Sequence, residues 1–166
     1  MSVNIALLTV TDTRTLENDK SGNILVEKIK KAKHNLVERK ICKDNKEDIK
    51  IILKEWTHKK DLDVIITTGG TGLTGRDITP EALDEIADKH IPGFGEIFRY
   101  YSLETVGTSA IQSRACAVLS NGKYIFALPG SSGGVTDAWD KILVHQLDIN
   151  HKPCNFVELF PRLKEK

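Results

Sequence analysis

The chain has 166 residues, of which 40% are hydrophobic, and its 24 Lys and Arg against 23 Asp and Glu give a net charge of +1. This length and composition are typical of one folded domain and not of a disordered chain. The near-neutral charge offers no overall attraction to nucleic acid or to an anionic membrane, so we expect neither as a partner.

The first predicted elements alternate between strand and helix. An apolar run over residues 3–10 predicts a buried first strand. Ser21 is expected to cap a first helix, which has apolar residues on one face and ends near His34. Residues 36–41 then form a second predicted strand, so the chain begins with a β-α-β pattern.

The alternation continues through the middle of the chain. Asn45 is expected to cap a second amphipathic helix, with Asp48 at its third position. The β-branched run over residues 63–67 is typical of a central parallel strand. Thr79 and Pro80 form an N-cap and first-turn pair, which predicts that a third helix begins there.

The second half of the chain is less regular. Residues 91–106 predict a separate short helix that packs on the domain or on a neighbouring subunit. Its aromatic residues are Phe94, Phe98, Tyr100 and Tyr101. Residues 115–119 and 123–128 are apolar runs joined by Ser-Asn-Gly, which predicts a hairpin, and residues 135–147 predict a last helix before a loose C-terminal tail. We therefore predict one α/β domain over residues 1–166. It has three layers in the order α, β, α, and its sheet is mostly parallel with one antiparallel strand.

Other composition signals narrow the possible functions. No apolar run approaches the roughly 20 residues that span a bilayer, and the N-terminus lacks the basic segment of a signal peptide. We therefore expect a cytoplasmic protein. The three cysteines are widely separated and the five histidines lack ligand spacing, so neither a disulfide framework nor a transition-metal site is expected.

A glycine-rich segment over residues 67–82 leaves a predicted strand and enters a predicted helix, where open parallel sheets bind ligands. Gly70, Gly72 and Gly75 match the G-x-G-x-x-G spacing of dinucleotide sites. That motif also needs a helix starting within the glycines and an acid about 20 residues on, at the end of a second strand. Here the helix starts later and the region near Glu96 is predicted to be helical, so this interpretation fails.

The same segment also has the glycine spacing of a P-loop. The residues that follow are Arg76 and Asp77, where that motif requires Lys and then Ser or Thr. The general property remains, because a glycine-rich turn exposes backbone N–H groups that receive phosphate oxygens. The alternative is a tight turn that only needs positive φ angles.

A third pattern, G-x-S-x-G over residues 130–134, stands in the place of a hydrolase nucleophile elbow. The acid and histidine of a triad would have to be Asp148 and His151, in a segment predicted to be a surface tail. Pro129 directly before the turn also restricts the strained geometry of an elbow. We therefore interpret this segment as a second anion-binding turn.

Several sequence blocks occur in a characteristic order along the chain. They are TVTDTR at 9–14, KDN at 43–45, TTGGTGLTGRDITPEA at 67–82, GFGEIFR at 93–99, GTSAIQSRA at 107–115 and LPGSSGG at 128–134. Together they resemble the molybdenum cofactor biosynthesis protein B family (MoaB/MogA), over nearly the whole chain. The KPCNF run at 152–156 resembles the MoaB branch.

The resemblance implies a molybdopterin-binding α/β fold and a homo-oligomer, either a trimer or a hexamer. It implies Mg²⁺-dependent transfer of an adenylyl group from ATP to molybdopterin, with release of pyrophosphate. Other molybdenum cofactor biosynthesis proteins are then expected as pathway partners. The rival hypothesis is a catalytically silent molybdopterin-binding or scaffold protein, because the same fold permits binding without turnover.

The resemblance also suggests site residues. Asp77 matches the essential aspartate of the glycine-rich block and Asp44 matches a second one, so both are candidate catalytic and Mg²⁺-binding residues; an ordinary turn or cap acid is the alternative for each. Some MoaB members lack the Arg-Asp pair, whereas this chain keeps Arg76 and Asp77. The candidate substrate-binding residues are Asp12, Thr13, Arg14, Gly69, Gly70, Thr71, Gly72, Arg76, Ser109, Ser113, Arg114, Pro129, Gly130, Ser131 and Ser132.

These residue types suit the implied reaction. The attacking group is a phosphate monoester that is already anionic at neutral pH, so no general base is required. Positioning and charge neutralisation must then supply the catalysis.

Overall fold

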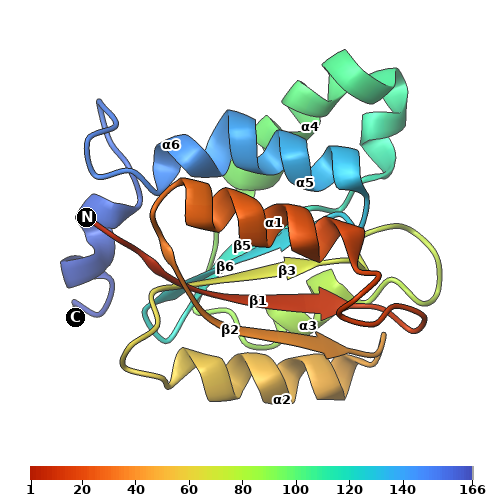
Figure 1. Cartoon of the computed structure of the whole chain (residues 1–166), viewed down its shortest axis with the longest axis horizontal. Coiled ribbons are helices and arrows are strands. Elements are labelled where there is room, and N and C mark those ends of the chain that lie inside the picture. The colour runs from red at the N-terminus through yellow and green to blue at the C-terminus, as the bar shows by residue number, and fades with distance from the viewer. Residues whose placement is uncertain (166) are drawn as a thin grey trace.

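The computed structural model describes residues 1–165 and shows one six-stranded sheet with helices on both faces (Figure 1). The spatial order of the strands is β2-β1-β3-β6-β5-β4. Their bounds are β1 Asn4–Val10, β2 Asn35–Cys42, β3 Val64–Thr68, β4 Lys89–His90, β5 Cys116–Ser120 and β6 Lys123–Leu128. The predicted domain over residues 1–166 also includes Lys166, which lies outside the described residues.

The pairing within the sheet agrees with the predicted fold class. Strand β1 pairs in parallel with β2 and β3, and β3 pairs in parallel with β6. Strand β5 runs antiparallel to both β6 and β4, so it is the one antiparallel strand. The chain runs from β1 to β2 on one side of β1 and then returns to form β3 on its other side. The carboxyl ends of β1 and β3 are therefore a topological switch point.

The helices form two layers. The layer with α1, α4, α5 and α6 covers one face of the sheet, and α2 and α3 cover the other (Figure 1). Their bounds are α1 Lys20–Lys31, α2 Lys46–Thr57, α3 Thr79–Asp84, α4 Pro92–Val106, α5 Ser132–Ala138 and α6 Val144–Gln146. A π-helical segment, Trp139–Leu143, joins α5 to α6, and 3₁₀ segments cover Gly107–Gln112 and Val157–Arg162. None of the helices in residues 1–165 combines the length and the apolar character that crossing a membrane requires.

Two hydrophobic cores lie on opposite faces of the sheet because successive side chains of a strand alternate between faces. In β1, Ile5 and Leu7 enter one core, while Ala6 and Leu8 enter the other. All four side chains are fully buried. This double burial explains why β1 is a nearly continuous apolar run.

Helix starts agree with the predictions in one case and differ in two. The Asn45 side chain accepts a hydrogen bond from the Asp48 backbone N–H at 3.1 Å, which confirms the predicted cap of α2. The predicted cap at Ser21 is wrong, because Asp19 caps α1 and Ser21 lies in its first turn. The predicted cap at Thr79 is also wrong: its hydroxyl donates to the Gly69 carbonyl at 2.9 Å and makes no capping bond.

Two predictions for the second half are also corrected. Helix α4 keeps the predicted bounds to within one residue but, with 15 residues, is longer than the short helix expected; Phe94 and Phe98 lie in the core of this chain, so they pack on the domain and are not available to a neighbour. The C-terminal segment is not loose, since Val157 is 2% exposed and begins a 3₁₀ helix. Phe156 packs on Tyr124 with ring centroids 4.7 Å apart, so long-range contacts order this segment.

The predicted hairpin is confirmed. Strands β5 and β6 are joined at Asn121 and Gly122, both of which have positive φ angles. This is the backbone conformation that a two-residue hairpin turn requires and that Asn-Gly adopts readily. The Asn121 side chain also donates to the Thr57 carbonyl at 3.0 Å, which ties the turn to the end of α2.

We expect Gly69→Ala to lower the free energy of unfolding by about 2 kcal/mol or more. Gly69 has φ +104°, and a Cβ at this position would stand 2.2 Å from the Val10 carbonyl oxygen. Gly75→Ala is the matched control, because nothing lies within 4 Å of its added Cβ and its φ is not positive. Urea unfolding of both variants measures the difference, and equal midpoints would contradict the steric argument.

Candidate functional site

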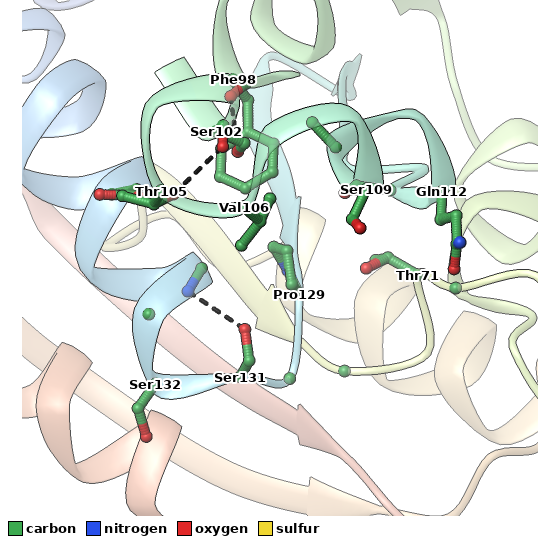
Figure 2. A pocket seen from close by; sticks show the side chains of 18 of the residues that line it. Thr71, Phe98, Ser102, Thr105, Val106, Ser109, Gln112, Pro129, Ser131 and Ser132 are labelled. Atoms are coloured by element: carbon green, nitrogen blue, oxygen red, sulfur yellow. Dashed lines mark hydrogen bonds between the residues drawn. The ribbon is translucent and has the colours of Figure 1, made fainter. Parts of the chain in front are cut away.

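A cavity of about 980 Å³ opens at the carboxyl ends of β3 and β6, next to the end of α4 (Figure 2). It brings together many of the residues predicted for the site: Gly69, Gly70, Thr71, Gly72, Asp77, Ser109, Ser113, Pro129, Gly130, Ser131 and Ser132. It is also lined by residues that the sequence analysis did not select, namely Phe98, Ser102, Thr105, Val106, Ala110, Gln112, Gly133, Gly134, Thr136 and Asp137.

The two glycine-rich turns of the cavity are joined directly. The Gly69 backbone N–H donates to the Leu128 carbonyl at 3.0 Å, and the Thr68 hydroxyl donates to the Pro129 carbonyl at 2.8 Å. A Cβ on Gly130 would stand 3.3 Å from the Gly69 Cα. Glycine at these positions therefore lets the loops after β3 and β6 approach each other closely.

The glycine-rich loop also requires glycine at its next position. Gly70 has φ +68°, and a Cβ there would stand 2.4 Å from the Thr79 hydroxyl oxygen. The Thr79 backbone N–H in turn donates to the Gly70 carbonyl at 3.0 Å. The start of α3 thus holds the loop in a conformation that a side chain would prevent, which agrees with the tight-turn interpretation.

Asp77 lies at the far end of this loop and remains ionised. Its carboxylate accepts hydrogen bonds from the Thr74 hydroxyl at 2.7 Å and from the Thr74 backbone N–H at 2.9 Å. Burial alone would raise the pKa of Asp77, but these hydrogen bonds to the charged form outweigh it and lower the pKa. The loop therefore presents a negative charge to the cavity at neutral pH.

Asp44 stands beside two other carboxylates. Its backbone N–H donates to the Asp12 carboxylate at 3.2 Å, and the position of a Gly70 Cβ is 3.4 Å from one Asp44 carboxylate oxygen. Burial and the neighbouring charges of Asp12 and Asp77 raise the pKa of Asp44. Arg76, whose Nη1 lies 3.3 Å from the Asp12 carboxylate, partly offsets this repulsion.

The oxygen donors of Asp44 and Asp77 are of the kind that Mg²⁺ prefers. No group of three or more His, Cys, Asp or Glu within residues 1–165 is arranged to hold a metal. Mg²⁺ commonly takes one or two protein carboxylates and completes its shell with phosphate oxygens and water. Asp44 and Asp77 supply oxygen donors of that kind, and their mutual repulsion would be relieved by a cation.

The sequence analysis did not select Asp19, a buried aspartate that stabilises residues next to the site. Asp19 is completely buried and accepts hydrogen bonds from the Thr9 hydroxyl at 2.5 Å and the Gly22 backbone N–H at 3.0 Å. The Arg39 guanidinium forms an ion pair with it at 3.0 Å. Burial alone would raise the pKa of Asp19, but these donors lower it. The sequence does contain a signal for its role, because aspartate is a common helix cap and Asp19 stands two residues before Ser21.

Arg14 connects this buried carboxylate to the cavity. Its Nη1 donates to the Gly130 carbonyl at 3.2 Å and to the Ser21 hydroxyl at 3.1 Å, and it lies 3.8 Å from the Asp19 carboxylate. Arg14 is thus placed behind the turn after β6 and does not line the cavity. Thr13, in the same loop, is exposed and also outside the lining.

Arg114 holds both ends of the glycine-rich loop. Its Nε donates to the Gly72 carbonyl and its Nη2 to the Asp77 carbonyl, both at 2.7 Å. Its Nη1 pairs with the Glu81 carboxylate, and its backbone N–H donates to the Thr71 carbonyl at 2.9 Å. Arg114 was predicted to bind substrate, but its guanidinium bonds to the loop and does not line the cavity.

The geometry disfavours the nucleophile elbow. The Ser131 hydroxyl accepts a hydrogen bond from the Gly134 backbone N–H at 3.1 Å, which makes it a helix cap. In residues 1–165 the non-glycine positive φ angles fall at Lys33 and Asn121, so Ser132 lacks the strained backbone of an elbow. His151 packs beside the His145 ring and lines a different cavity.

The chain is similar to proteins of one pathway. Residues 6–149 match the family described as "Probable molybdopterin binding domain". "Molybdenum cofactor biosynthesis protein B" of Escherichia coli is 44% identical over 161 residues, covering 97% of this chain and 93% of the relative. The protein of the same name from Bacillus cereus is 46% identical over 146 residues, covering 87% and 86%.

Solved structures agree with these similarities. A crystal structure of "Molybdenum cofactor biosynthesis protein B" superposes with a TM-score of 0.89 at 41% identity, covering 100% of this chain and 98% of the other. The "tungsten cofactor synthesizing protein MoaB from Pyrococcus furiosus" superposes with a TM-score of 0.77 at 36% identity, covering 86% and 91%. The predicted fold class and the predicted family are therefore confirmed.

We expect Asp19→Asn to lower the free energy of unfolding at pH 7 by about 2–4 kcal/mol, because it leaves the Arg39 charge without its buried partner. The folded-state pKa of Asp19 is lowered, so its contribution is complete above about pH 4 and is lost as pH falls through the folded-state pKa. Denaturant unfolding from pH 7 to pH 2 should show the difference in unfolding free energy between the two proteins narrowing below about pH 4. A difference that does not change with pH would rule out a charge-based contribution.

Proposed function

Because the chain belongs to the molybdenum cofactor biosynthesis protein B family, we propose that it transfers an adenylyl group from ATP to molybdopterin and releases pyrophosphate. The observation that supports this reaction is that two glycine-rich turns share one cavity with Asp77, while Asp44 lies beside the glycine-rich loop and outside the cavity lining. Other proteins of the pathway would supply the pterin and take up the product.

In this proposal the chain acts through positioning and charge. The loop over residues 69–72 and the turn over residues 130–132 offer backbone N–H groups to phosphate oxygens. Arg114 and Arg14 keep these two segments in place by binding their carbonyls. Molybdopterin carries a phosphate monoester that is already ionised, so no side chain has to remove a proton.

Asp44 and Asp77 are the residues that would hold Mg²⁺. Once bound, this ion neutralises triphosphate charge and stabilises the leaving pyrophosphate. Arg76 stands beside Asp12 and limits the repulsion among the carboxylates before substrates bind. The retained pair of Arg76 and Asp77 favours turnover over silent binding.

We also propose that the chain assembles as a homo-oligomer through an exposed apolar stripe. The stripe consists of Ile97, Tyr100, Leu103 and Ile111, which are 48%, 66%, 51% and 82% exposed. It lies on α4 and the following 3₁₀ segment, which also form one side of the cavity. A monomeric protein seldom exposes such an apolar stripe to water, so we expect a second copy of the chain to bury it.

We expect Asp77→Asn to reduce adenylyl transfer about a hundredfold or more, because the neutral amide no longer holds the metal against the triphosphate. Molybdopterin binding should persist, since its anionic phosphate gains nothing from a nearby carboxylate. Pyrophosphate release with molybdopterin, ATP and Mg²⁺ measures turnover, and equilibrium titration measures binding.

Asp84→Asn, at an exposed position of α3, is the matched control and should retain full turnover. Normal turnover in Asp77→Asn would remove that carboxylate from the mechanism. Loss of pterin binding in the same variant would instead show that Asp77 only maintains the loop. A wild-type protein that binds molybdopterin without releasing pyrophosphate would favour the silent-binder alternative.

For the oligomer, we expect Leu103→Glu to shift the wild-type assembly towards monomer, because a charge would have to be buried in the interface. Ile51→Glu is the matched control, since Ile51 is 64% exposed on α2, in the opposite helix layer. Light scattering at micromolar concentration gives the masses. A monomeric wild type, or equal masses for the two variants, would contradict this interface.

A further inference from the structure

Asp137 is a carboxylate in the cavity that the proposed reaction does not yet use. It lies on α5 and lines the same cavity as the glycine-rich loop. Its side chain is only 14% exposed. One carboxylate oxygen accepts a hydrogen bond from the Thr105 hydroxyl at 2.9 Å, and Lys141 Nζ stands 3.6 Å from the other oxygen.

Asp137 belongs to the end of the cavity away from the glycine-rich loop. Its hydrogen-bond partner Thr105 lies on the opposite side of the cavity from Thr71, with Val106 and Pro129 between them (Figure 2). Phe98 also lines this middle part. A ligand whose phosphate occupies the loop would therefore lay an apolar or planar part along these side chains and bring its far end towards Asp137.

The free acceptor capacity of Asp137 suits a particular ligand edge. An ionised carboxylate only accepts hydrogen bonds, and its two oxygens together offer about four acceptor positions. Thr105 takes one of them, and at 3.6 Å Lys141 supplies charge compensation without a hydrogen bond. What remains is acceptor capacity inside a partly apolar cavity, which matches a ligand with two adjacent N–H donors.

We propose that Asp137 determines specificity by accepting hydrogen bonds from the 2-amino group and the N3–H of a pterin ring. A pterin presents these two donors side by side, whereas adenine has an amino group flanked only by acceptor nitrogens. The carboxylate therefore distinguishes the pterin from the nucleotide base at this end of the cavity. The inference rests on the proposed function in one respect, that the chain binds a pterin.

Asp137 also takes part in a contact between helices, which the test must separate from recognition. Lys141 pairs with Glu104 on α4 at 2.8 Å, and Thr105 on the same helix donates to Asp137. If this contact were the whole role of Asp137, its removal would affect stability and every ligand alike. If Asp137 recognises the ligand, its removal should lower the affinity for the pterin and leave the affinity for ATP unchanged.

The experiment compares two probes that differ at a single ring position. They are the phosphate esters of 6-hydroxymethylpterin and of the matching lumazine, in which oxygen replaces the 2-amino group. Fluorescence titration of the wild-type protein should show the pterin ester binding about ten- to a hundredfold more tightly, as charge-assisted hydrogen bonds would give. Asp137→Asn should reduce this preference to about threefold or less, because an amide has one acceptor oxygen and an NH₂ group that only donates. Its affinity for ATP should not change.

Two further variants keep the test decisive. Glu104→Gln removes one negative charge that pairs with Lys141, as Asp137→Asn does. Because Glu104 lies outside the cavity lining, this variant should retain the wild-type preference for the pterin ester. Asp137→Ser removes the carboxylate without adding an amide and should lose the preference as well. Thermal unfolding of all variants shows which of them fold.

The outcomes separate this inference from the proposed function. A wild-type protein that binds both esters equally, or a preference that persists in Asp137→Asn or Asp137→Ser, overturns the role of Asp137 while pterin binding stands. Equal loss of preference in Glu104→Gln overturns it too, because the helix contact would then be the cause. A wild-type protein that binds ATP but neither ester overturns both proposals.

Discussion

The close backbone approach at Gly69 is the constraint on which the rest of the site depends. Its missing side chain allows the Val10 carbonyl from β1 to lie against the loop after β3, and its N–H bonds the Leu128 carbonyl at the end of β6. Three parallel strands therefore end within contact of one residue. The loops that follow β1, β3 and β6 carry Asp12, Asp77 and Ser131, so this one approach brings together segments that are distant in sequence.

Electrostatics divides the aspartates near these strand ends into two groups. Asp19 is completely buried, yet its pKa is lowered, because a hydroxyl, an amide and Arg39 all stabilise its charge. Asp44 is less buried, yet its pKa is raised, because its burial and the charges of two neighbouring carboxylates disfavour its ionised form. A satisfied carboxylate stabilises the fold, whereas an unsatisfied one is available to a cation or a ligand. Sequence motifs contain both kinds without distinguishing them.

The layers of the fold were predictable because their signals are local. The apolar run of β1 and the cap at Asn45 each depend on residues within one element. The predictions failed where a distant partner decided the outcome. Phe98 points into the core because the sheet lies beneath α4, and Asp19 outcompetes Ser21 as a cap because Arg39 from β2 reaches it. The role of Arg114 was missed because its partners belong to a loop about 40 residues away.

The candidate site shows the same division. The part of the site proposed to bind anions consists of backbone groups, and what it requires of the sequence is glycine at crowded positions, so the motif at residues 69–72 is visible in the sequence. Its other part is built from side chains of α4 and α5, such as Thr105 and Asp137, which fit no fixed spacing because two helices contribute them. Under the proposed function, these backbone groups would bind the phosphate of either ligand, so they would not decide which ring system is bound. Under the proposed function, the choice of ring would depend on the side chains at the other end, where Thr105 and Asp137 lie on helices and not on the sheet.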